Sequence, residues 1–490
     1  MDIFVLVWNP AQVVMPKDTN QRTIQVLLAR HCVAPWLVAA LCIGLLRFLY
    51  LDVWSLWYDE ALTVSDAWNG APGRFHQASY HLIRWTVDVL GGQIDGWSLR
   101  FLPALVGFLV IPTCYWAFLP IAGSRRAGVA AALLAASSWQ QYWSQTARGY
   151  TMTEWIGLLG TGIFLRGLRR ANGPQTLIGL CVVGSGSFFH PHGAVVAVGM
   201  ALGLGAYALD PTQRERLLVP LKWIVGGACI ALVWQGPALL SAFRTYQSGG
   251  ALGGLSSFLH LIKSTAFFLT PVIGVGLWIG GLHAVFAGQK HGQYLLAVVL
   301  STSCCIAILS LFGMVSAQYL FGLHPWMLVL ATWPLDSIQM PRRVRLAYVA
   351  VLLLPSLAQI GLYSTVRQGE RPRWREAYDY VWNHRSEHDL VLGMQAGLGD
   401  FYLDPGFTDV RHPRTVGWND RTQPQNFRSA RRSVRPTWLV IRPAFLDLWK
   451  RGPRQELRAF LARDCRLVER FSLPMEGRDL DLVIYYKPGR

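Results

Sequence analysis

The sequence predicts an α-helical polytopic membrane protein of about eleven transmembrane helices, followed by a small C-terminal α/β domain outside the membrane. Two observations predict the membrane class. The 490 residues are 52% hydrophobic with a mean hydropathy of +0.29, and only 15% of them are charged, against roughly 25% in soluble domains. A third observation predicts the second domain, because the long apolar runs stop near residue 366 and charged residues become frequent.

Transmembrane helices are expected wherever about 20 mostly apolar residues follow one another, since this length crosses the hydrocarbon core of a bilayer. Several runs are short or contain glycine and proline, so their ends are approximate. Together they form a transmembrane domain over 33–365. We predict spans at about 33–51, 98–121, 127–144, 151–168, 175–189, 193–209, 221–238, 264–287, 294–313, 319–335 and 345–364.

Lysine and arginine in the loops predict the orientation, because these residues are enriched on the cytoplasmic side. With the N-terminal segment 1–32 in the cytoplasm, the inner loops hold a clear excess of basic residues. An odd number of spans then places 366–490 on the extracytoplasmic face of a plasma membrane, such as a bacterial inner membrane. The acidic residues are instead more frequent on the outer side, so we expect the reactive site on the outer face. The long outer loop 52–97 is rich in tryptophan and is expected to form helices along the membrane surface.

Charge and cysteine content exclude two other classes. The net charge of +17 is spread over loops without a long basic run, so we expect no nucleic-acid partner, and membrane orientation with anionic lipid accounts for the charge. The eight cysteines form no CxxC pair and no zinc spacing. Most of them fall in expected spans, where small apolar packing is their usual role.

Alternating apolar and polar residues predict the elements of the C-terminal domain. No glycine-rich nucleotide motif and no internal repeat is visible there. We expect helices at 374–383 and 455–463, and strands at 389–394, 438–442, 467–473 and 480–486.

Two adjacent carboxylates, Asp59 and Glu60, follow the first span within the stretch SLWYDEALT at 55–63. A carboxylate at a membrane boundary is costly to dehydrate, which makes it a functional-site candidate. Neighbouring side chains point in different directions on any regular element. We therefore expect separate roles, one carboxylate accepting a proton and the other holding local structure or a cation. The alternative is a solvated loop whose acids only mark the water boundary.

Further candidates lie at the outer boundary of other spans. Glu154, at the start of span 151–168, is either a functional acid or an anion that suits the helix dipole. Basic side chains there either bind a phosphate group or extend to the interface. The histidines lack the i, i+4 spacing of a helical metal pair. The basic candidates are Arg100, Arg148, Arg244 and Lys263, and the histidine candidates are His76, His190, His192 and His324.

The order of these motifs resembles the GT-C superfamily of glycosyltransferases, in the branch that contains the protein O-mannosyltransferases and the lipid A aminoarabinose transferase. The resemblance covers most of the chain, and the motif at 55–63 is its first part. The other matches are FHQASYH at 75–81, SLRFLPAL at 98–105, ARGYTMTE at 147–154, FFHPHG at 188–193 and RWREA at 373–377. Two departures are Gln77-Ala78, where the family often has prolines, and Gln318-Tyr319, where many members have Arg-Tyr.

The resemblance implies that a sugar linked to a polyprenyl phosphate reaches the site from the bilayer and is transferred with inversion. It implies Asp59 as the general base toward the acceptor hydroxyl, Glu60 as the residue that orients the loop, and Glu154 as an acid near the acceptor or a cation. His76 and Arg148 are then the first candidates to bind the donor phosphate. The further candidates are Arg100, Arg244 and Lys263 for the phosphate, and Tyr150, His190, His192, Tyr319 and His324 without an assigned role.

We therefore predict a hexosyl- or pentosyltransferase whose acceptor is a lipid, a glycan or a protein. The motifs require no cofactor, and a divalent cation is an open possibility. A lipid-linked glycan polymerase or ligase is the main alternative, since it shares the loops and cations but does not need the Asp-Glu pair. A secondary transporter is another alternative. It would have acidic residues near the bilayer midplane and repeated halves, whereas the acidic residues here are concentrated at one face and no repeat is visible. A catalytically inactive relative is the last alternative.

Overall fold

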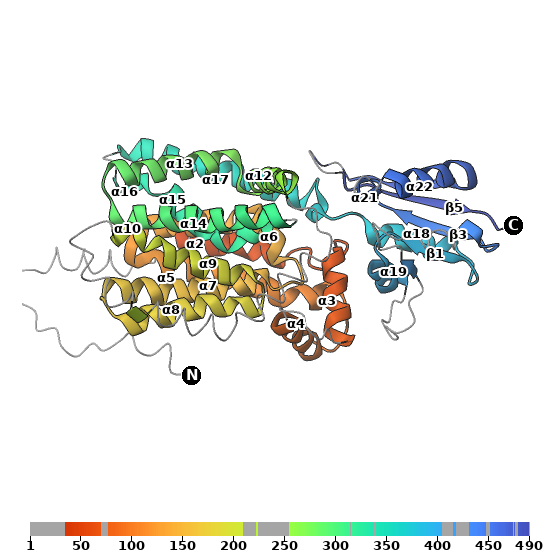
Figure 1. Ribbon diagram of the computed structural model, residues 1–490, viewed down its shortest axis with the longest axis horizontal. Coiled ribbons are helices and arrows are strands. Elements are labelled where there is room, and N and C mark those ends of the chain that lie inside the picture. Colours follow the sequence, from red (N-terminus) through yellow and green to blue (C-terminus); the bar gives the residue numbers. More distant parts are fainter. Residues whose placement is uncertain are drawn as a thin grey trace, which may run out of the picture.

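The computed structural model describes residues 35–69, 77–208, 222–223, 254–313, 315–337, 340–403, 415–417, 431–446, 451–473, 475 and 479–489. They form two parts that lie end to end (Figure 1). The first is a bundle of helices whose long members run along the long axis of the molecule. The second is a sheet with helices on both sides. Two short helices, α3 and α4, lie at the end of the bundle that faces the sheet.

The helical part is built from long helices interrupted by short ones. Most of the predicted spans correspond to a helix or a pair of helices. The elements are α2 Pro35–Gly44, η1 Leu45–Phe48, α3 Tyr58–Asn69, α4 Gln77–Val89, α5 Gly96–Ala135, α6 Ser138–Ser144, α7 Tyr150–Arg169, α8 Gly173–Ser185, η2 Gly186–Phe188, α9 His192–Gly203, α10 Gly205–Ala208, α12 Leu255–Leu269, α13 Pro271–Phe286, α14 Lys290–Phe312, η3 Ala317–Leu323, α15 His324–Ala331, α16 Pro334–Ser337, α17 Arg342–Ser364 and η4 Gln368–Glu370.

Three helices in the described part, α5, α14 and α17, are long and apolar enough to cross a membrane, or four if α12 and α13 count as one bent span. The predicted span 264–287 corresponds to the end of α12 and to α13, which meet at 96°. Thr270 has φ 63°, and Pro271 begins α13 with a ring that cannot continue the preceding helix. The predicted span 221–238 lies almost wholly outside the described residues.

The predicted spans 98–121 and 127–144 are also arranged differently. Helix α5 contains all of the first and the first half of the second, and it bends at Gly123, whose φ of 76° suits glycine. It ends at Ala135, and Ser137 caps the separate short helix α6 by accepting a hydrogen bond from the Gln140 amide. Hydropathy identifies both segments as apolar, but it does not predict the bend at Gly123 or the end of α5 at Ala135.

Helix α6 carries polar side chains into the bundle, where they hold the end of the first span. Gln141 donates to the carbonyl of Leu46 at 2.9 Å, and Gln145 donates to the carbonyls of Arg47 and Leu49 at 3.1 and 2.6 Å. These carbonyls lie at or just after the C-terminal end of η1, where carbonyls lack partners further along the helix, and the Leu46 carbonyl also accepts from the Leu49 amide at 3.1 Å. The contacts therefore fix where the chain leaves η1 and enters the first loop.

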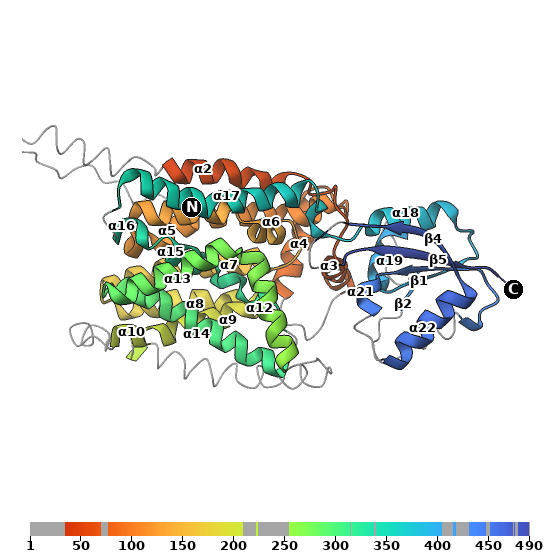
Figure 2. The ribbon, with the colours of Figure 1, turned by 90° about the horizontal axis from the view of Figure 1, so that it is seen from above.

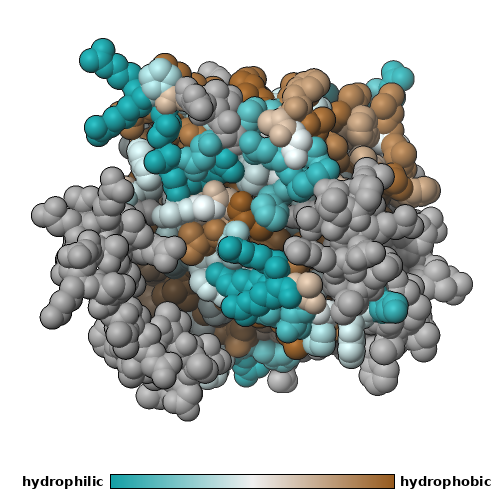
Figure 3. Space-filling view, turned by 90° about the vertical axis from the view of Figure 1, so that its left-hand side faces the viewer, coloured by the Kyte–Doolittle hydropathy of each residue, from teal (hydrophilic) through white to brown (hydrophobic). Residues whose placement is uncertain are grey.

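The surface of the bundle carries large apolar side chains, as a lipid-facing surface requires. On α13, Val275, Trp278 and Phe286 are 58%, 65% and 83% exposed. Figure 3 looks onto the end of the bundle away from the sheet, where a group of hydrophilic residues lies near the middle of the view. The polar contacts at this end include an ion pair between Arg126 and Asp336.

The second part is a five-stranded sheet of order β2-β1-β3-β5-β4, shown edge-on between α18 and α22 in Figure 2. Strands β2, β1 and β3 are parallel, and β5 pairs antiparallel with β3 and β4. The predicted elements all have counterparts, whereas α19, β2 and α21 were not foreseen. The bounds are α18 Trp374–His384, β1 Leu390–Gly393, α19 Ala396–Leu403, β2 Thr415–Gly417, β3 Thr437–Ile441, α21 Pro443–Leu446, α22 Arg451–Asp464, β4 Arg466–Phe471 and β5 Leu482–Lys487.

Both faces of the sheet are covered, so its central strand is apolar throughout rather than alternating. All five residues of β3 are buried. Val440 packs on the α18 side with Trp374 and Tyr378, while Leu439 packs on the α22 side with Phe460. The side that carries α18 also continues into the first loop of the bundle.

One hydrophobic core joins the first loop to the sheet domain. Leu56, Ala61 and Val64 of the loop belong to the same buried cluster as Trp374 and Tyr378 of α18. Polar contacts reinforce the junction. The Leu56 amide donates to the hydroxyl of Tyr402 at 2.6 Å, and Arg375 contacts the Asp52 carboxylate at 3.1 Å. The C-terminal domain therefore directly supports the loop that carries the adjacent carboxylates.

Candidate functional site

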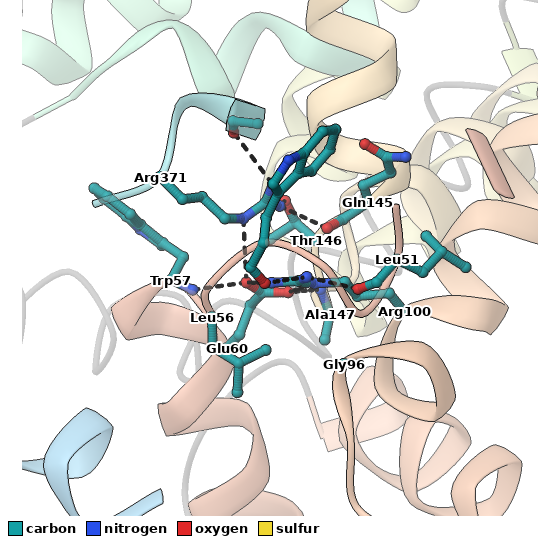
Figure 4. Close-up of polar contacts among 12 residues, drawn as sticks. Leu51, Leu56, Trp57, Glu60, Gly96, Arg100, Gln145, Thr146, Ala147 and Arg371 are labelled. Atoms are coloured by element: carbon teal, nitrogen blue, oxygen red, sulfur yellow. Dashed lines mark hydrogen bonds and ion pairs between the residues drawn. The ribbon is translucent and has the colours of Figure 1, made fainter. Parts of the chain in front are cut away.

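Glu60 is the centre of a buried network at the start of α3, and its side chain is 0% exposed. Its carboxylate accepts hydrogen bonds from the amides of Trp57 and Ala147 at 2.7 and 2.8 Å. It also receives two charged hydrogen bonds from Arg100, at 2.8 and 2.9 Å. Arg371 adds a third charged contact at 3.5 Å. Figure 4 shows these groups converging on one carboxylate from four separate segments.

Arg100 uses its whole guanidinium in this network. Besides the two bonds to Glu60, its Nη atoms donate to the carbonyls of Leu51, Trp54 and Ser55 at 2.7, 2.9 and 2.9 Å. The five N–H donors of an arginine are thereby occupied, and the side chain is 0% exposed. The structure corrects the sequence-based interpretation of Arg100 as a phosphate ligand, because it has no donor left for a phosphate.

Arg371 is the residue that sequence reasoning missed. It lies in the linker after α17, and its Nη2 donates to the Gln145 carbonyl and the Thr146 hydroxyl at 2.5 and 2.8 Å. Its Nη1 donates to the Tyr363 hydroxyl at 3.3 Å. Burial opposes its charge, but Tyr363 and Glu60 raise the pKa of Arg371 above the usual range. Only its position two residues before the RWREA motif could have drawn attention to it.

Glu60 gives a first prediction about pH. Burial alone raises the pKa of Glu60, but the charges of Arg100 and Arg371 outweigh it and lower the pKa from 4.5 to about 2. A lowered folded-state pKa contributes stability above pH 4.5 that is lost as the pH falls toward 2. The shift corresponds to about 3 kcal/mol. Glutamine does not titrate, so we expect the stability difference between wild type and Glu60→Gln to shrink below about pH 4.

Melting curves of both proteins in detergent at about pH 6 and about pH 3 measure this difference. A gap that is equally wide at both pH values contradicts the prediction, because the carboxylate then contributes nothing through its charge.

Asp59 lies one residue before Glu60 but faces another environment. It is partly exposed in the first turn of α3. Arg148, in the segment between α6 and α7, donates to the Thr63 hydroxyl at 3.2 Å and to the Tyr80 hydroxyl at 3.3 Å. Burial alone lowers the pKa of Arg148, but the Asp59 carboxylate and the hydroxyls of Tyr150 and Tyr80 raise it above its usual range. Arg148 Nη1 also donates to the backbone carbonyl of Asp59 at 3.5 Å, so the guanidinium lies beside the first turn of α3.

Aromatic and imidazole rings lie next to Asp59 and Arg148. The ring of Tyr150 lies between Trp143, at 3.8 Å between centroids, and His190, at 4.3 Å. The Nδ1 atoms of His190 and His192 are 2.7 Å apart, so one of them donates to the other. Tyr319 packs against His190 at 5.5 Å. One region therefore contains candidate residues from five parts of the chain, namely α3, the α6–α7 segment, α7, the η2–α9 segment and η3.

Two other candidates lie inside the bundle, apart from this group. Glu154 is 1% exposed and accepts a hydrogen bond from Gln140 at 2.8 Å, while its Oε1 has no hydrogen-bond partner among the residues described. Its position fits a buried polar contact between α6 and α7. His324 is also buried, and its ring lies tilted against Trp139 with 5.0 Å between the ring centroids. Neither side chain has a contact to Asp59 in the described part of the chain.

Of the remaining candidates, the structure describes Lys263, which makes no contact with this group. Lys263 is exposed on α12 and makes no hydrogen bond or ion pair within the described ranges. His76 and Arg244 lie outside the described residues. Within those ranges, no group of three or more His, Cys, Asp or Glu side chains is placed to hold a metal ion.

No protein-family model and no curated protein matches the sequence. Solved structures do match. ArnT from Cupriavidus metallidurans, bound to undecaprenyl phosphate, aligns over 93% of this chain and 98% of its own, with 16% identity and a TM-score of 0.54. Its apo form aligns over 95% of this chain, with the same identity and TM-score.

A second neighbour is the oligosaccharyltransferase of Archaeoglobus fulgidus tethered with an acceptor peptide. It aligns over 80% of this chain and 64% of its own, with 12% identity and a TM-score of 0.52. This chain therefore spans less than two thirds of the length of that enzyme. At these identities the similarity concerns the fold alone, and this chain shares the fold of ArnT and of the archaeal oligosaccharyltransferase.

Proposed function

We propose that this protein is an integral-membrane glycosyltransferase that moves a sugar from a polyprenyl-phosphate donor to an acceptor hydroxyl on the extracytoplasmic face, with inversion. The observation that carries the proposal is the contact of Arg148 with the backbone of Asp59 at 3.5 Å, which places a cation beside a partly exposed carboxylate residue on a GT-C fold. One group suits proton removal and the other suits a phosphate. The neighbouring structures, whose ligands include undecaprenyl phosphate, support the class of donor.

In the proposed reaction the acceptor oxygen attacks the anomeric carbon while Asp59 takes the proton of the hydroxyl. The new carbon–oxygen bond forms as the bond between the anomeric carbon and the phosphate oxygen breaks. The polyprenyl phosphate leaves with that electron pair, and Arg148 stabilises its growing negative charge. Glu60 keeps Asp59 in place by fixing the first turn of α3. We propose that Tyr150, His190, His192 and Tyr319 line the sugar.

The test is to reconstitute the protein in vesicles with a mixture of polyprenyl-phosphate sugars and to follow the release of free polyprenyl phosphate. Loss of one donor from the mixture identifies the sugar, and mass spectrometry of the product identifies the acceptor class. A single transferred sugar supports the proposal, whereas chain growth indicates a polymerase. Transfer of a preassembled glycan indicates a ligase, and retention of donor without turnover indicates an inactive relative.

Arg148→Met is expected to lower kcat by roughly 10²–10³-fold, as the loss of one group that stabilises developing charge typically does. The matched control is Lys263→Met, which removes an exposed cation from α12, and we expect it to keep turnover close to wild type. Steady-state release of polyprenyl phosphate measures both. Equal turnover in wild type and Arg148→Met rejects the role of Arg148, and a large loss in Lys263→Met reassigns the phosphate contact to α12.

A further inference from the structure

A hollow of about 260 Å³ lies behind the first loop, on the side of Glu60 that faces the linker. Its walls come from the end of the first span, from the linker after α17 and from the start of α18. Trp54 forms a wall that stacks on Tyr50 at 5.4 Å and meets Tyr363 edge-on at 5.1 Å. The lining residues are Tyr50, Val53, Trp54, Ser55, Ser364, Thr365, Gln368, Arg371, Arg373 and Glu376.

The polar groups of this hollow include Arg373 and Glu376. The Glu376 carboxylate accepts a hydrogen bond from the Ser55 hydroxyl at 3.4 Å, and the Arg373 guanidinium lies 5.7 Å from the centre of the Phe471 ring. Arg373 donates from Nε to the Glu376 carboxylate at 2.8 Å, and its two Nη groups have no hydrogen-bond partner in the described part of the chain. The two side chains are 35% and 39% exposed. Two parallel N–H groups suit a phosphate, and the carboxylate beside them suits an ammonium group.

The rim of the hollow is apolar and lies at the end of a helix that is long enough to cross a membrane. Helix α17 ends at Ser364, which lines the hollow. Tyr50, Val53 and Val366 around it are 47%, 62% and 50% exposed. A polar hollow with an apolar rim at a span boundary is at the depth of lipid headgroups, where aromatic residues are enriched.

We propose that this hollow binds the headgroup of a bilayer phospholipid that carries both a phosphate and a primary ammonium group. Arg373 binds the phosphate and Glu376 binds the ammonium, while the acyl chains run down past Tyr50 and Val53. The site is distinct from the Asp59–Arg148 group and goes beyond the glycosyl-transfer proposal. It shares Ser55 and Arg371 with the support of the first loop, so a bound lipid stabilises the loop that carries Asp59.

The test is lipid retention, measured by native mass spectrometry after delipidation in detergent and titration with phosphatidylethanolamine or phosphatidylglycerol. Wild type is expected to prefer phosphatidylethanolamine. Arg373→Met is expected to weaken binding of both lipids by at least roughly tenfold, because the charged hydrogen bonds to the phosphate are lost. Glu376→Gln is expected to abolish the preference while leaving phosphatidylglycerol binding intact. The control is Arg451→Met, which removes an exposed arginine on α22.

The result that overturns the proposal is unchanged lipid retention in both hollow variants, or an equal loss in Arg451→Met. Undecaprenyl phosphate is included as a competitor. If it displaces phosphatidylethanolamine and its own binding is the one lost in Arg373→Met, the hollow belongs to the donor lipid and the proposal is wrong. The assay needs no turnover, so its outcome is independent of whether the protein transfers a sugar.

Discussion

Replacing Glu60 with glutamine is expected to destabilise the protein by about 3–5 kcal/mol, because two buried arginines lose their common counterion. Arg100 and Arg371 are both fully or almost fully buried around the Glu60 carboxylate. Glutamine keeps the shape, so the loss comes from charge rather than from packing. Denaturant titration of the detergent-solubilised protein at neutral pH measures the change.

The matched control is Glu376→Gln, which breaks an ion pair with Arg373 on the surface. Exposed pairs contribute only about 0–1 kcal/mol, so this variant is expected to unfold nearly like wild type. If Glu60→Gln costs no more than Glu376→Gln, the buried network does not hold the first loop, and the support assigned to Arg371 is withdrawn as well.

Replacing Asp59 with asparagine is expected to slow sugar transfer by about 10²–10⁴-fold, the usual contribution of a general base. Asparagine keeps the size of the side chain but cannot accept the proton of the acceptor hydroxyl. Since Asp59 is partly exposed and lies outside the Glu60 network, folding is expected to stay close to wild type. Donor binding is expected to persist, so the loss should fall on kcat.

Single-turnover rates separate this effect from binding, because they report the chemical step with donor already bound. A variant that binds no donor contradicts the assignment, since Asp59 then contributes to binding rather than to proton removal.

Hydropathy and short motifs predict much of the architecture, because burial in lipid or in a core is written into local composition. The predicted span 151–168 corresponds to α7, Tyr150–Arg169, and the predicted strand 438–442 corresponds to β3, Thr437–Ile441. The sequence-based prediction misses local bends and ends of helices. At Thr270 the backbone adopts a positive φ, which composition does not indicate, and the predicted span 264–287 is bent there between α12 and α13.

The contacts of the site were less predictable than the fold. Arg100 was a reasonable phosphate ligand by charge and position, but its five donors are taken by Glu60 and by loop carbonyls 45–49 residues away in sequence. Arg371 lies still further along the chain. Such long-range pairing depends on how the first loop folds against α5 and the linker, which local periodicity does not encode.

The measurement that tests the central claim most directly compares wild type, Asp59→Asn and Asp88→Asn in vesicles supplied with mixed polyprenyl-phosphate sugars. Asp88 is an exposed carboxylate on α4, so its replacement controls for the loss of a negative charge near the first loop. The account predicts release of polyprenyl phosphate by wild type and Asp88→Asn, and its near-complete loss in Asp59→Asn. Equal release by all three proteins contradicts the assignment of Asp59 as the base.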